Sequence, residues 1–305
     1  MDYELAIIGG GPAGFTAGIY ATRAGIRTVL FDAGMGGGLM ALSPEIENYP
    51  GFKSISGLEL ADKMREHVEK YMTLNFGESV EKLKVSGDEV KIKTSKDTYG
   101  VGAVIIATGT EHRKLDVRGE EKLTGFGVSY CATCDGPFFK GKKVIVVGGG
   151  NSALIEAIAL KNMGVDVTLV HRRNELRAED AYEKRAVEAG VKVLYETHVA
   201  KIKGEKMVES VVLRNVKDGN MTELKVNGVF VSIGEIPQTQ LAKQIGVELD
   251  EKGYIKTGRN MRTNIKRVYA AGDVTGGLRQ VITACAEGAI AALASMEVLG
   301  KVYPY

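Results

Sequence analysis

Short apolar runs alternate with longer helical patterns along this chain. Residues 3–8 and 27–32 are apolar runs, and the alanine-rich segment between them predicts a helix. The same order returns at residues 143–147 and 166–171, again with a helical pattern between the two runs. Strands that alternate with helices form parallel sheets, so the pattern predicts an α/β protein built from two β-α-β units.

Other segments fill in around these two units. Residues 57–72 place apolar side chains on one face and predict an amphipathic helix, whereas residues 80–107 predict several short strands. Two further apolar runs, residues 229–234 and 268–274, each lead into a turn that contains glycine. Residues 280–299 are mostly alanine and aliphatic, so we expect a buried final helix there.

Each predicted β-α-β unit has a glycine-rich turn between its first strand and its helix. In the first unit Gly9 makes the turn, Gly11 lets the backbone approach a pyrophosphate, and Gly14 lets helix and strand pack closely. The second unit has Gly148-Gly149-Gly150-Asn151-Ser152-Ala153 at the same place. One such turn can occur by chance, but two copies in the correct context predict two nucleotide sites, each with its phosphates at a helix N-terminus.

The two units differ at the end of the second strand. The first has Asp32, 23 residues after Gly9, and a carboxylate there accepts hydrogen bonds from an adenosine ribose. His171 has the same offset from Gly148 and is followed by arginines, whose guanidinium groups bind a 2′-phosphate that a carboxylate would repel. These are Arg172, Arg173 and Arg177. The first site therefore suits FAD or NAD and the second suits NADPH, unless the arginines only form a solvated basic face.

Composition limits the classes of protein to which the chain can belong. Its 305 residues predict two domains, and its 39 glycines exceed the usual share, which fits a chain with several tight turns. A net charge of +2 argues against a nucleic-acid or anionic-membrane partner. The chain has no apolar stretch of roughly 18 residues and no export signal at its start, so we expect a cytoplasmic protein without a transmembrane helix.

Cys131 and Cys134 form a C-x-x-C pair in a chain with three cysteines. A zinc site would need further Cys or His ligands at suitable spacing, and a purely structural disulfide is rare in a reducing compartment. The pair is therefore interpreted as a redox-active dithiol. Asp135 follows it directly, either as a proton donor and acceptor for the thiols or as a turn-forming residue before Gly136. Cys285 is expected to be a small core residue.

Together these motifs resemble those of the low-molecular-weight NADPH–thioredoxin reductases, which are flavoprotein disulfide reductases. The resemblance spans nearly the whole chain in family order, and CATCDGPFF at residues 131–139 is its most specific part. The other motifs are GGGPAG near the start, IENYPG at 46–51, ATG at 107–109, GGGNSA with HRRNELRA, IGEIPQT at 233–239 and AAGDVTGGLRQ at 270–280. Leu39 replaces a glutamine, Ile155 an acid and Gln238 an asparagine that are common in the family.

The resemblance implies two Rossmann-like three-layer domains, the second inserted in the first. Residues 1–113 and 241–305 would form a discontinuous FAD-binding domain, and residues 114–240 an NADPH-binding domain that carries the dithiol. Cys134 would face the flavin, Cys131 would attack the disulfide of thioredoxin, and Asp135 would be the acid/base.

The resemblance also implies the residues that bind the cofactors. FAD contacts are expected from Gly9, Gly11, Pro12, Ala13, Gly14, Asp32, Gly37, Gly38, Leu39, Asn48, Ala107, Thr108, Gly109, Gly272, Asp273, Arg279, Gln280 and Val281. NADPH contacts are expected from Gly148, Gly150, Asn151, Ser152, His171, Arg172, Arg173 and Arg177. Ile233 and Gly234 complete the expected cofactor-binding set.

A motion and partners are implied as well. The dithiol and the NADPH motif belong to the inserted domain, whereas the flavin motifs belong to the other domain. The family is understood to rotate one domain about crossings near residues 112–116 and 237–241 between half-reactions. We expect a homodimer and a thioredoxin or glutaredoxin-like partner. Two alternatives stay open: a sibling reductase that serves another carrier protein, and a flavin-binding redox sensor without turnover.

Overall fold

The chain divides into two compact units in the computed structural model, which describes residues 3–43 and 45–302. The first unit comprises residues 1–111 and 236–305, and the second comprises residues 112–235. The second unit is therefore an insertion within the first.

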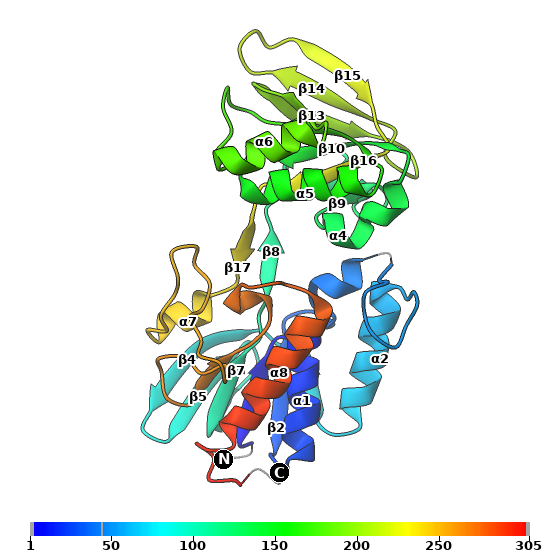
Figure 1. Ribbon diagram of the computed structural model, residues 1–305. Helices are drawn as coiled ribbons and strands as arrows, with labels where there is room; N and C mark the ends of the chain where they lie inside the picture. Colours follow the sequence, from blue (N-terminus) through cyan, green and yellow to red (C-terminus); the bar gives the residue numbers. More distant parts are fainter. Residues whose placement is uncertain (1–2, 44, 303–305) are drawn as a thin grey trace. The chain divides into compact units, whose positions relative to one another are not determined.

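Two short strands lie where the chain passes between the units. They are β8 (Thr110–His112) and β17 (Glu235–Pro237), which pair with each other in a two-stranded sheet (Figure 1). The boundaries expected from the sequence, 113/114 and 240/241, lie two and five residues further along the chain than those of the compact units.

A five-stranded parallel sheet forms the middle layer of the first unit. Its strands lie in the order β18-β7-β1-β2-β3. They are Val268–Ala270 (β18), Ala103–Ile106 (β7), Leu5–Ile8 (β1), Thr28–Asp32 (β2) and Thr73–Phe76 (β3). Leu5 and Ile7 pack in a core on one face of the sheet, and Ala6 and Ile8 pack in a core on the other. Parallel sheets with both faces covered have continuous apolar strands, which explains the uninterrupted run at β1.

Helices cover one face of this sheet and an antiparallel sheet covers the other (Figure 1). The helical face carries α1 (Pro12–Arg23), α8 (Val281–Ser295) and α2 (Gly57–Glu69). The opposite face carries β4 (Val80–Ser86), β5 (Glu89–Thr94), β6 (Thr98–Val101) and α7 (Gln240–Gln244). Gly288 lets α8 approach α1 closely, because a side-chain carbon there would collide with the backbone of Ala13. The first unit thus has the predicted three layers.

The second unit repeats this architecture. Its parallel sheet has the order β12-β11-β10-β16-β9, with strands Lys192–Leu194, Asp166–Val170, Lys143–Gly148, Gly228–Ser232 and Val128–Ser129. One face packs against α4 (Ala132–Asp135), α5 (Asn151–Asn162) and α6 (Asp180–Glu188). The other face packs against an antiparallel sheet of β13 (Thr197–Lys203), β14 (Ser210–Asn215) and β15 (Met221–Lys225). The structure therefore contains two three-layer α/β units, as the fold class predicts.

Several elements are shorter than the sequence pattern predicts. The helix expected to run to residue 72 ends at Glu69, and the final helix ends at Ser295, after which residues 296–300 form turns. The strand expected over 268–274 ends at Ala270. The remaining short helices are η1 (Gly38–Leu42), α3 (Glu120–Leu123), η2 (Gly136–Phe139) and η3 (Asp273–Thr275). Across residues 3–43 and 45–302, no helix has the length and apolar character needed to cross a membrane.

Candidate functional site

Three glycines shape the turn between β1 and α1 in different ways. Gly9 has a φ of +109°, and a side-chain carbon there would collide with the Ala107 carbonyl. At Gly14 it would collide with the Gly9 carbonyl oxygen, so helix and strand are in close backbone contact. Gly11 instead faces open space, with no atom within 4 Å of where a Cβ would lie. Gly11 is the N-cap of α1 and no side chain caps the helix, so its first N–H groups face an open approach suited to a pyrophosphate.

Asp32, at the end of β2, fixes this turn through its carboxylate. Oδ2 accepts the N–H of Gly10 at 2.7 Å, and Oδ1 accepts the N–H of Gly34 at 2.7 Å. Each carboxylate oxygen has a further lone-pair site, so these bonds leave capacity for the ribose hydroxyls that the sequence predicts. The structure thus adds a positioning role to the expected binding role.

A second glycine loop lies against the first turn. Gly37 donates its N–H to the Gly10 carbonyl at 2.7 Å, and a Cβ at Gly38 would be 3.5 Å from the Gly11 Cα. Both loop glycines have positive φ values, +93° and +58°. Leu39 follows in η1, where the family commonly has glutamine, so only backbone groups of this loop are polar at that point.

The glycine–acid segment after β18 lies at the same end of the sheet. Gly272 has a φ of +80°, and a side-chain carbon there would be 2.9 Å from the Ala13 Cβ. Glu287 on α8 holds this segment, because its Oε2 accepts the Gly272 N–H at 2.7 Å and the Thr275 hydroxyl at 3.1 Å. Asp273 follows directly in η3. The carboxyl ends of parallel strands are where α/β sheets bind nucleotides, and this segment lies there.

Two side-chain hydrogen bonds tie further predicted residues together. Asn48 Nδ2 donates to Gln280 Oε1 at 3.0 Å, and the Thr108 hydroxyl donates to the Gln238 carbonyl at 2.6 Å. Gln280 also begins α8 with a capping box to Thr283. Arg279, just before it, has a φ of +50°, which is rare for a residue with a side chain. Strained backbone of this kind concentrates at binding and catalytic sites.

The turn between β10 and α5 repeats the geometry of the first turn. A side-chain carbon at Gly148 would collide with the Ser232 carbonyl, and one at Gly149 would collide with the His171 ring. Gly150 faces open space, is the N-cap of α5 and has no side-chain cap. The second unit therefore has a second open helix N-terminus that suits phosphate.

His171 lies behind this turn. Its side chain is only 5% exposed, and Nδ1 is 2.9 Å from the Gly148 carbonyl oxygen. Nε2 is buried and has no hydrogen-bond partner within residues 3–43 and 45–302. Packing against Gly149 therefore fixes where the following segment begins.

The three predicted arginines lie in the loop that follows His171, and their side chains are exposed. They are Arg172, Arg173 and Arg177. Ser152 is exposed on the first turn of α5, and Ile233 and Gly234 follow β16, whose Ser232 pairs with Gly148. Exposed guanidinium groups beside an uncapped helix N-terminus form a cationic surface suited to a nucleotide with an additional phosphate.

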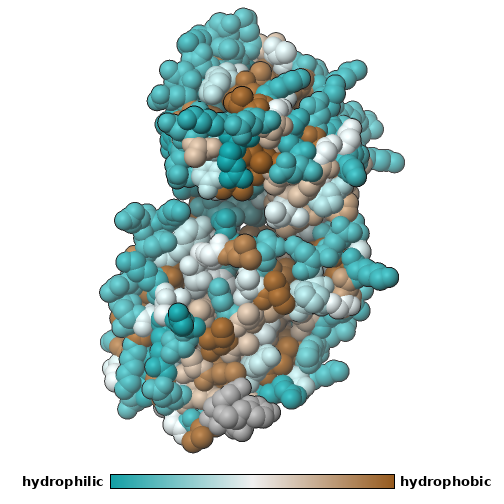
Figure 2. All heavy atoms as spheres, viewed as in Figure 1, coloured by the Kyte–Doolittle hydropathy of each residue, from teal (hydrophilic) through white to brown (hydrophobic). Residues whose placement is uncertain are grey.

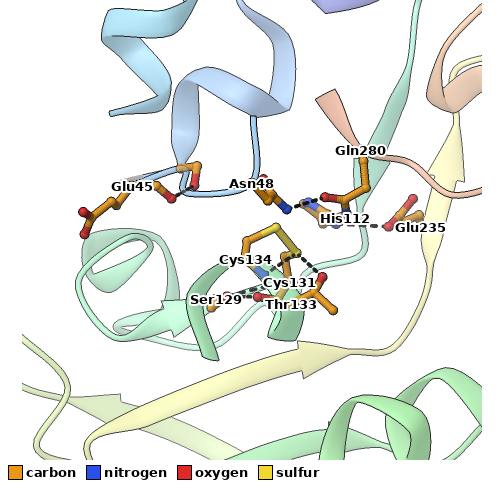
Figure 3. The surroundings of a disulfide bond; sticks show 10 residues. Glu45, Asn48, His112, Ser129, Cys131, Thr133, Cys134, Glu235 and Gln280 are labelled. Carbon is orange, nitrogen blue, oxygen red and sulfur yellow. Dashed lines mark hydrogen bonds and ion pairs between the residues drawn. A yellow bond between two sulfur atoms is a disulfide. The ribbon is translucent and has the colours of Figure 1, made fainter. Parts of the chain in front are cut away.

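A disulfide joins the two cysteines of the C-x-x-C motif: Cys131, the N-cap of α4, and Cys134 within that helix (Figure 3). Their Cα atoms are 5.3 Å apart. Cys131 Sγ accepts the Cys134 N–H at 3.2 Å and lies 3.4 Å from the Thr133 hydroxyl oxygen. The Ser129 hydroxyl accepts the Cys131 N–H at 3.1 Å. The Cys134 N–H and the Thr133 hydroxyl therefore lie against Cys131 Sγ, and both groups can donate a hydrogen bond to it.

Asp135 follows Cys134 and is half-buried. Burial raises the pKa of its carboxyl above the ordinary value, and a hydrogen bond with Ser129 lowers it in part. Oδ1 is buried and makes no hydrogen bond to any residue that the structure describes. A carboxyl with a raised pKa beside the disulfide can hold and release a proton near neutral pH more readily than an ordinary aspartate.

Comparison with known proteins decides the family. The family model described as pyridine nucleotide-disulphide oxidoreductase matches residues 3–288. The chain belongs to this family. A protein named thioredoxin reductase from Listeria innocua is 44% identical over 294 residues, which cover 95% of this chain and 91% of that protein. Another protein of that name, from Bacillus subtilis, is 43% identical over 295 residues, covering 95% and 92%.

A solved structure agrees with the family assignment of this pyridine nucleotide-disulphide oxidoreductase. Thioredoxin reductase from Streptococcus pyogenes has a TM-score of 0.93 at 41% identity, covering 98% of this chain and 99% of that one. The likeness extends to both units, because it covers nearly the whole of both chains.

Some residues of this oxidoreductase reach the sites without having been predicted. Thr133, Ser129 and Glu287 hydrogen-bond to the cysteine loop or to the Gly272 turn. Ser129 and Thr133 lie within two residues of Cys131, so their hydroxyls beside the motif were a usable signal. Glu287 is 15 residues from Gly272, and an acid on an otherwise apolar helix was the only sign of it. Cys285 is buried, as the sequence predicts, and burial raises the pKa of its thiol.

Proposed function

We propose that this chain is an FAD-dependent thioredoxin reductase that takes electrons from NADPH and passes them through Cys131 and Cys134 to oxidised thioredoxin. The observation that carries the proposal is the disulfide between these cysteines in the same unit as the arginine-flanked nucleotide turn. The relatives named above support it, because they match this chain over almost their whole length.

FAD is assigned to the first unit. The open space at Gly11 fits a pyrophosphate, and the Asp32 carboxylate fits a ribose without a 2′-phosphate. The segments at Gly38 and Gly272 lie against this turn, so they would line the same nucleotide. The domain that binds FAD is accordingly residues 1–111 with 236–305, close to the boundaries expected from sequence.

NADPH is assigned to the second unit. The open space at Gly150 fits its pyrophosphate, and the exposed guanidinium groups of Arg172, Arg173 and Arg177 fit its 2′-phosphate. The unit has no acid at the position that corresponds to Asp32, since His171 stands there. This difference in charge is the physical basis for distinguishing NADPH from NADH.

Bound FAD supplies the hydride acceptor for NADPH and the two-electron donor for the disulfide. The Cys131 thiolate then attacks one sulfur of the thioredoxin disulfide, forming a mixed disulfide and releasing the other thioredoxin sulfur. Cys134 attacks Cys131 Sγ, which re-forms the internal disulfide and releases the second thioredoxin thiol. Asp135 gives its proton to the first leaving sulfur, takes the proton of the Cys134 thiol and passes it to the second, so both thioredoxin sulfurs end protonated and Asp135 ends ionised.

A rotation between the units belongs to the proposal. The cysteines and the NADPH turn are in one unit and the FAD turn is in the other. The electron donor of the flavin and its electron acceptor therefore both belong to the second unit. The β8 and β17 strands, where the chain passes between the units, would carry the rotation. A relative, the thioredoxin reductase of Lactococcus lactis, is described in an FR conformation at 41% identity and a TM-score of 0.67. A crosslink that fixes the units should slow turnover; unchanged turnover contradicts the rotation.

We also propose a cytoplasmic homodimer. Apolar side chains are exposed on the helical face of the first unit: Tyr20 on α1 is 46% exposed, and Ile282 and Ile290 on α8 are 44% and 41% exposed. Figure 2 shows hydrophobic spheres over the region where Figure 1 shows these helices. A second copy that covers this face would bury them. Light scattering on the purified protein measures whether its mass is that of one chain or of two. The variant Ile290→Glu tests whether this face forms the dimer.

One purification tests the function. The protein should be yellow, its flavin should be bleached by NADPH more readily than by NADH, and thioredoxin should reoxidise it. Colourless protein that does not take up FAD would contradict the whole assignment. A glutaredoxin-like protein as acceptor in parallel distinguishes the sibling reductase, and bleaching without reoxidation by any disulfide protein indicates a sensor.

A further inference from the structure

The loop between β11 and α6 is tied back to the glycine turn at its far end. The Arg177 N–H donates to the Gly149 carbonyl at 2.6 Å. Asn151 and Glu179, each two residues beyond these groups in the chain, hydrogen-bond to each other in both directions. Asn151 Nδ2 donates to Glu179 Oε1 at 2.8 Å, and the Glu179 N–H donates to Asn151 Oδ1 at 2.8 Å. Asn151 begins α5 and Glu179 is the N-cap of α6, so the pair joins two helix starts. We call the pair of Asn151 and Glu179 the clamp.

We propose that Asn151 and Glu179 are positioning residues that hold the arginine loop closed against the glycine turn and thereby set the affinity for the 2′-phosphate of NADPH. The inference rests on the proposed function, since it takes NADPH as the nucleotide. It adds a positioning role to the contact with the cofactor that is expected of Asn151. Each polar atom of the Asn151 side chain is bonded to Glu179, so the residue also acts through the loop.

Both ends of the loop are anchored, and the arginines lie between the anchors. At the start, His171 is buried against Gly149, with Nδ1 2.9 Å from the Gly148 carbonyl oxygen. At the end, the clamp and the Arg177 N–H fix the chain. Residues in a loose loop must be ordered when they bind a ligand, and that loss of entropy weakens binding. A loop that is already closed presents its guanidinium groups to the phosphate without this loss.

The hydrogen bonds of the clamp, rather than its charge, should matter. Glu179 places a carboxylate near a site for an anion, and a negative charge there opposes phosphate. A glutamine at 179 keeps an Oε1 acceptor for Asn151 Nδ2 and the same backbone N–H, but it has no charge. Glu175 provides the matched control, because it is an exposed acid in the same loop and has no hydrogen bond or ion pair with the residues described.

Calorimetric titration of the flavin-loaded protein tests the clamp. The two probes are 2′,5′-ADP, which carries the 2′-phosphate, and AMP, which lacks it. Asn151→Ala should weaken the binding of 2′,5′-ADP about fivefold, as expected for the loss of two hydrogen bonds. It should change the affinity for AMP by less than about twofold. Glu179→Gln and Glu175→Ala should bind 2′,5′-ADP at least as tightly as the wild type. In turnover, Asn151→Ala should raise the KM for NADPH and leave kcat unchanged.

The outcomes separate the clamp from the proposed function. If the wild type binds 2′,5′-ADP no more tightly than AMP, the NADPH assignment fails and the clamp falls with it. If the wild type shows the preference and Asn151→Ala keeps it, only the clamp is overturned. An equal loss for both probes also overturns it, because the pair would then support the whole turn. Hydrogen exchange gives an independent measure: Asn151→Ala should speed exchange of the Arg177 amide, and unchanged exchange contradicts a closed loop held by the clamp.

Discussion

Replacing Gly11 with alanine adds one methyl group in open space beside the turn between β1 and α1. No atom lies within 4 Å of the new carbon, and the backbone φ of −83° is ordinary for alanine. Replacing glycine with alanine at an N-cap lowers the free energy of unfolding by up to about 1 kcal/mol. Alanine also restricts the unfolded chain, which raises the free energy of unfolding by about 0.4–1 kcal/mol. The variant should therefore fold with nearly wild-type stability. Its methyl group occupies the approach assigned to the pyrophosphate, so it should purify largely without flavin.

Gly14→Ala, three residues later, should have the opposite effect. Its methyl carbon would lie more than 1 Å inside the closest approach of 3.0 Å to the Gly9 carbonyl oxygen. Overpacking of this kind costs about 3 kcal/mol at the upper end, and alanine returns about 1 kcal/mol of helix propensity. A net loss of about 2 kcal/mol lowers the melting temperature of a unit of this size by about 4–8 °C.

Melting of flavin-free protein and flavin content on purification measure the two effects separately, because bound FAD would itself raise the melting temperature. Gly150→Ala is the matched control: it adds a methyl group in equally open space at the second turn, so it should keep FAD and lose affinity for NADP⁺. A Gly11→Ala protein that binds FAD as tightly as the wild type would refute the assignment of the pyrophosphate. Equal melting of the Gly11 and Gly14 variants would refute the packing argument.

Three further outcomes are expected. Cys131→Ser or Cys134→Ser should reduce thioredoxin reduction to background while NADPH still bleaches the flavin; residual thioredoxin turnover would contradict the dithiol route. Arg172→Ala combined with Arg173→Ala should narrow the NADPH-over-NADH ratio of kcat/KM by about 30-fold, from about 1 kcal/mol for each exposed phosphate contact, and an unchanged ratio would contradict the 2′-phosphate site. Burial raises the pKa of Asp135 in the folded protein, so folding stability falls as the pH rises from about 4 to that raised value and stays lowered above it. Asp135→Asn should then stabilise the protein at alkaline pH, have no effect below about pH 4, and slow thioredoxin reduction; melting curves across pH that show alkaline destabilisation would refute the sign.

The features predicted best from the sequence are those whose cause is local. The glycines of the first turn, the strands that flank it and the helix that follows lie within about 30 residues of one another, and each obeys a steric rule that one short segment expresses. The C-x-x-C spacing likewise places the two sulfurs about one helical turn apart, which is why a disulfide joins Cys131, the N-cap of α4, to Cys134 in that helix.

Contacts between distant segments were not predictable in the same way. Nothing in the pattern of residues 80–101 says that β4, β5 and β6 cover the second face of the parallel sheet, because an alternating strand pattern fixes one buried face and not its partner. Asn151 and Glu179 are 28 residues apart and partly exposed, so neither periodicity nor burial marks them. The final helix ends at Ser295 although its apolar pattern continues, because helix ends depend on local backbone contacts that composition does not encode.

The two turns show how one backbone device serves two cofactors. At each turn one glycine faces open space at an uncapped helix N-terminus, and a neighbouring glycine is in close contact with a residue at the carboxyl end of the second strand. These pairs are Gly10 with Asp32, the last residue of β2, and Gly149 with His171, which directly follows β11. The backbone therefore provides the same phosphate site twice, and the choice of nucleotide must come from that neighbouring residue and the loop after it. A carboxylate bonded to Gly10 in one unit and a buried ring followed by arginines in the other give opposite charge at equivalent places. Exchanging the loop after the second strand should accordingly change which nucleotide is preferred. Replacing the open glycine should instead change whether a dinucleotide binds at all.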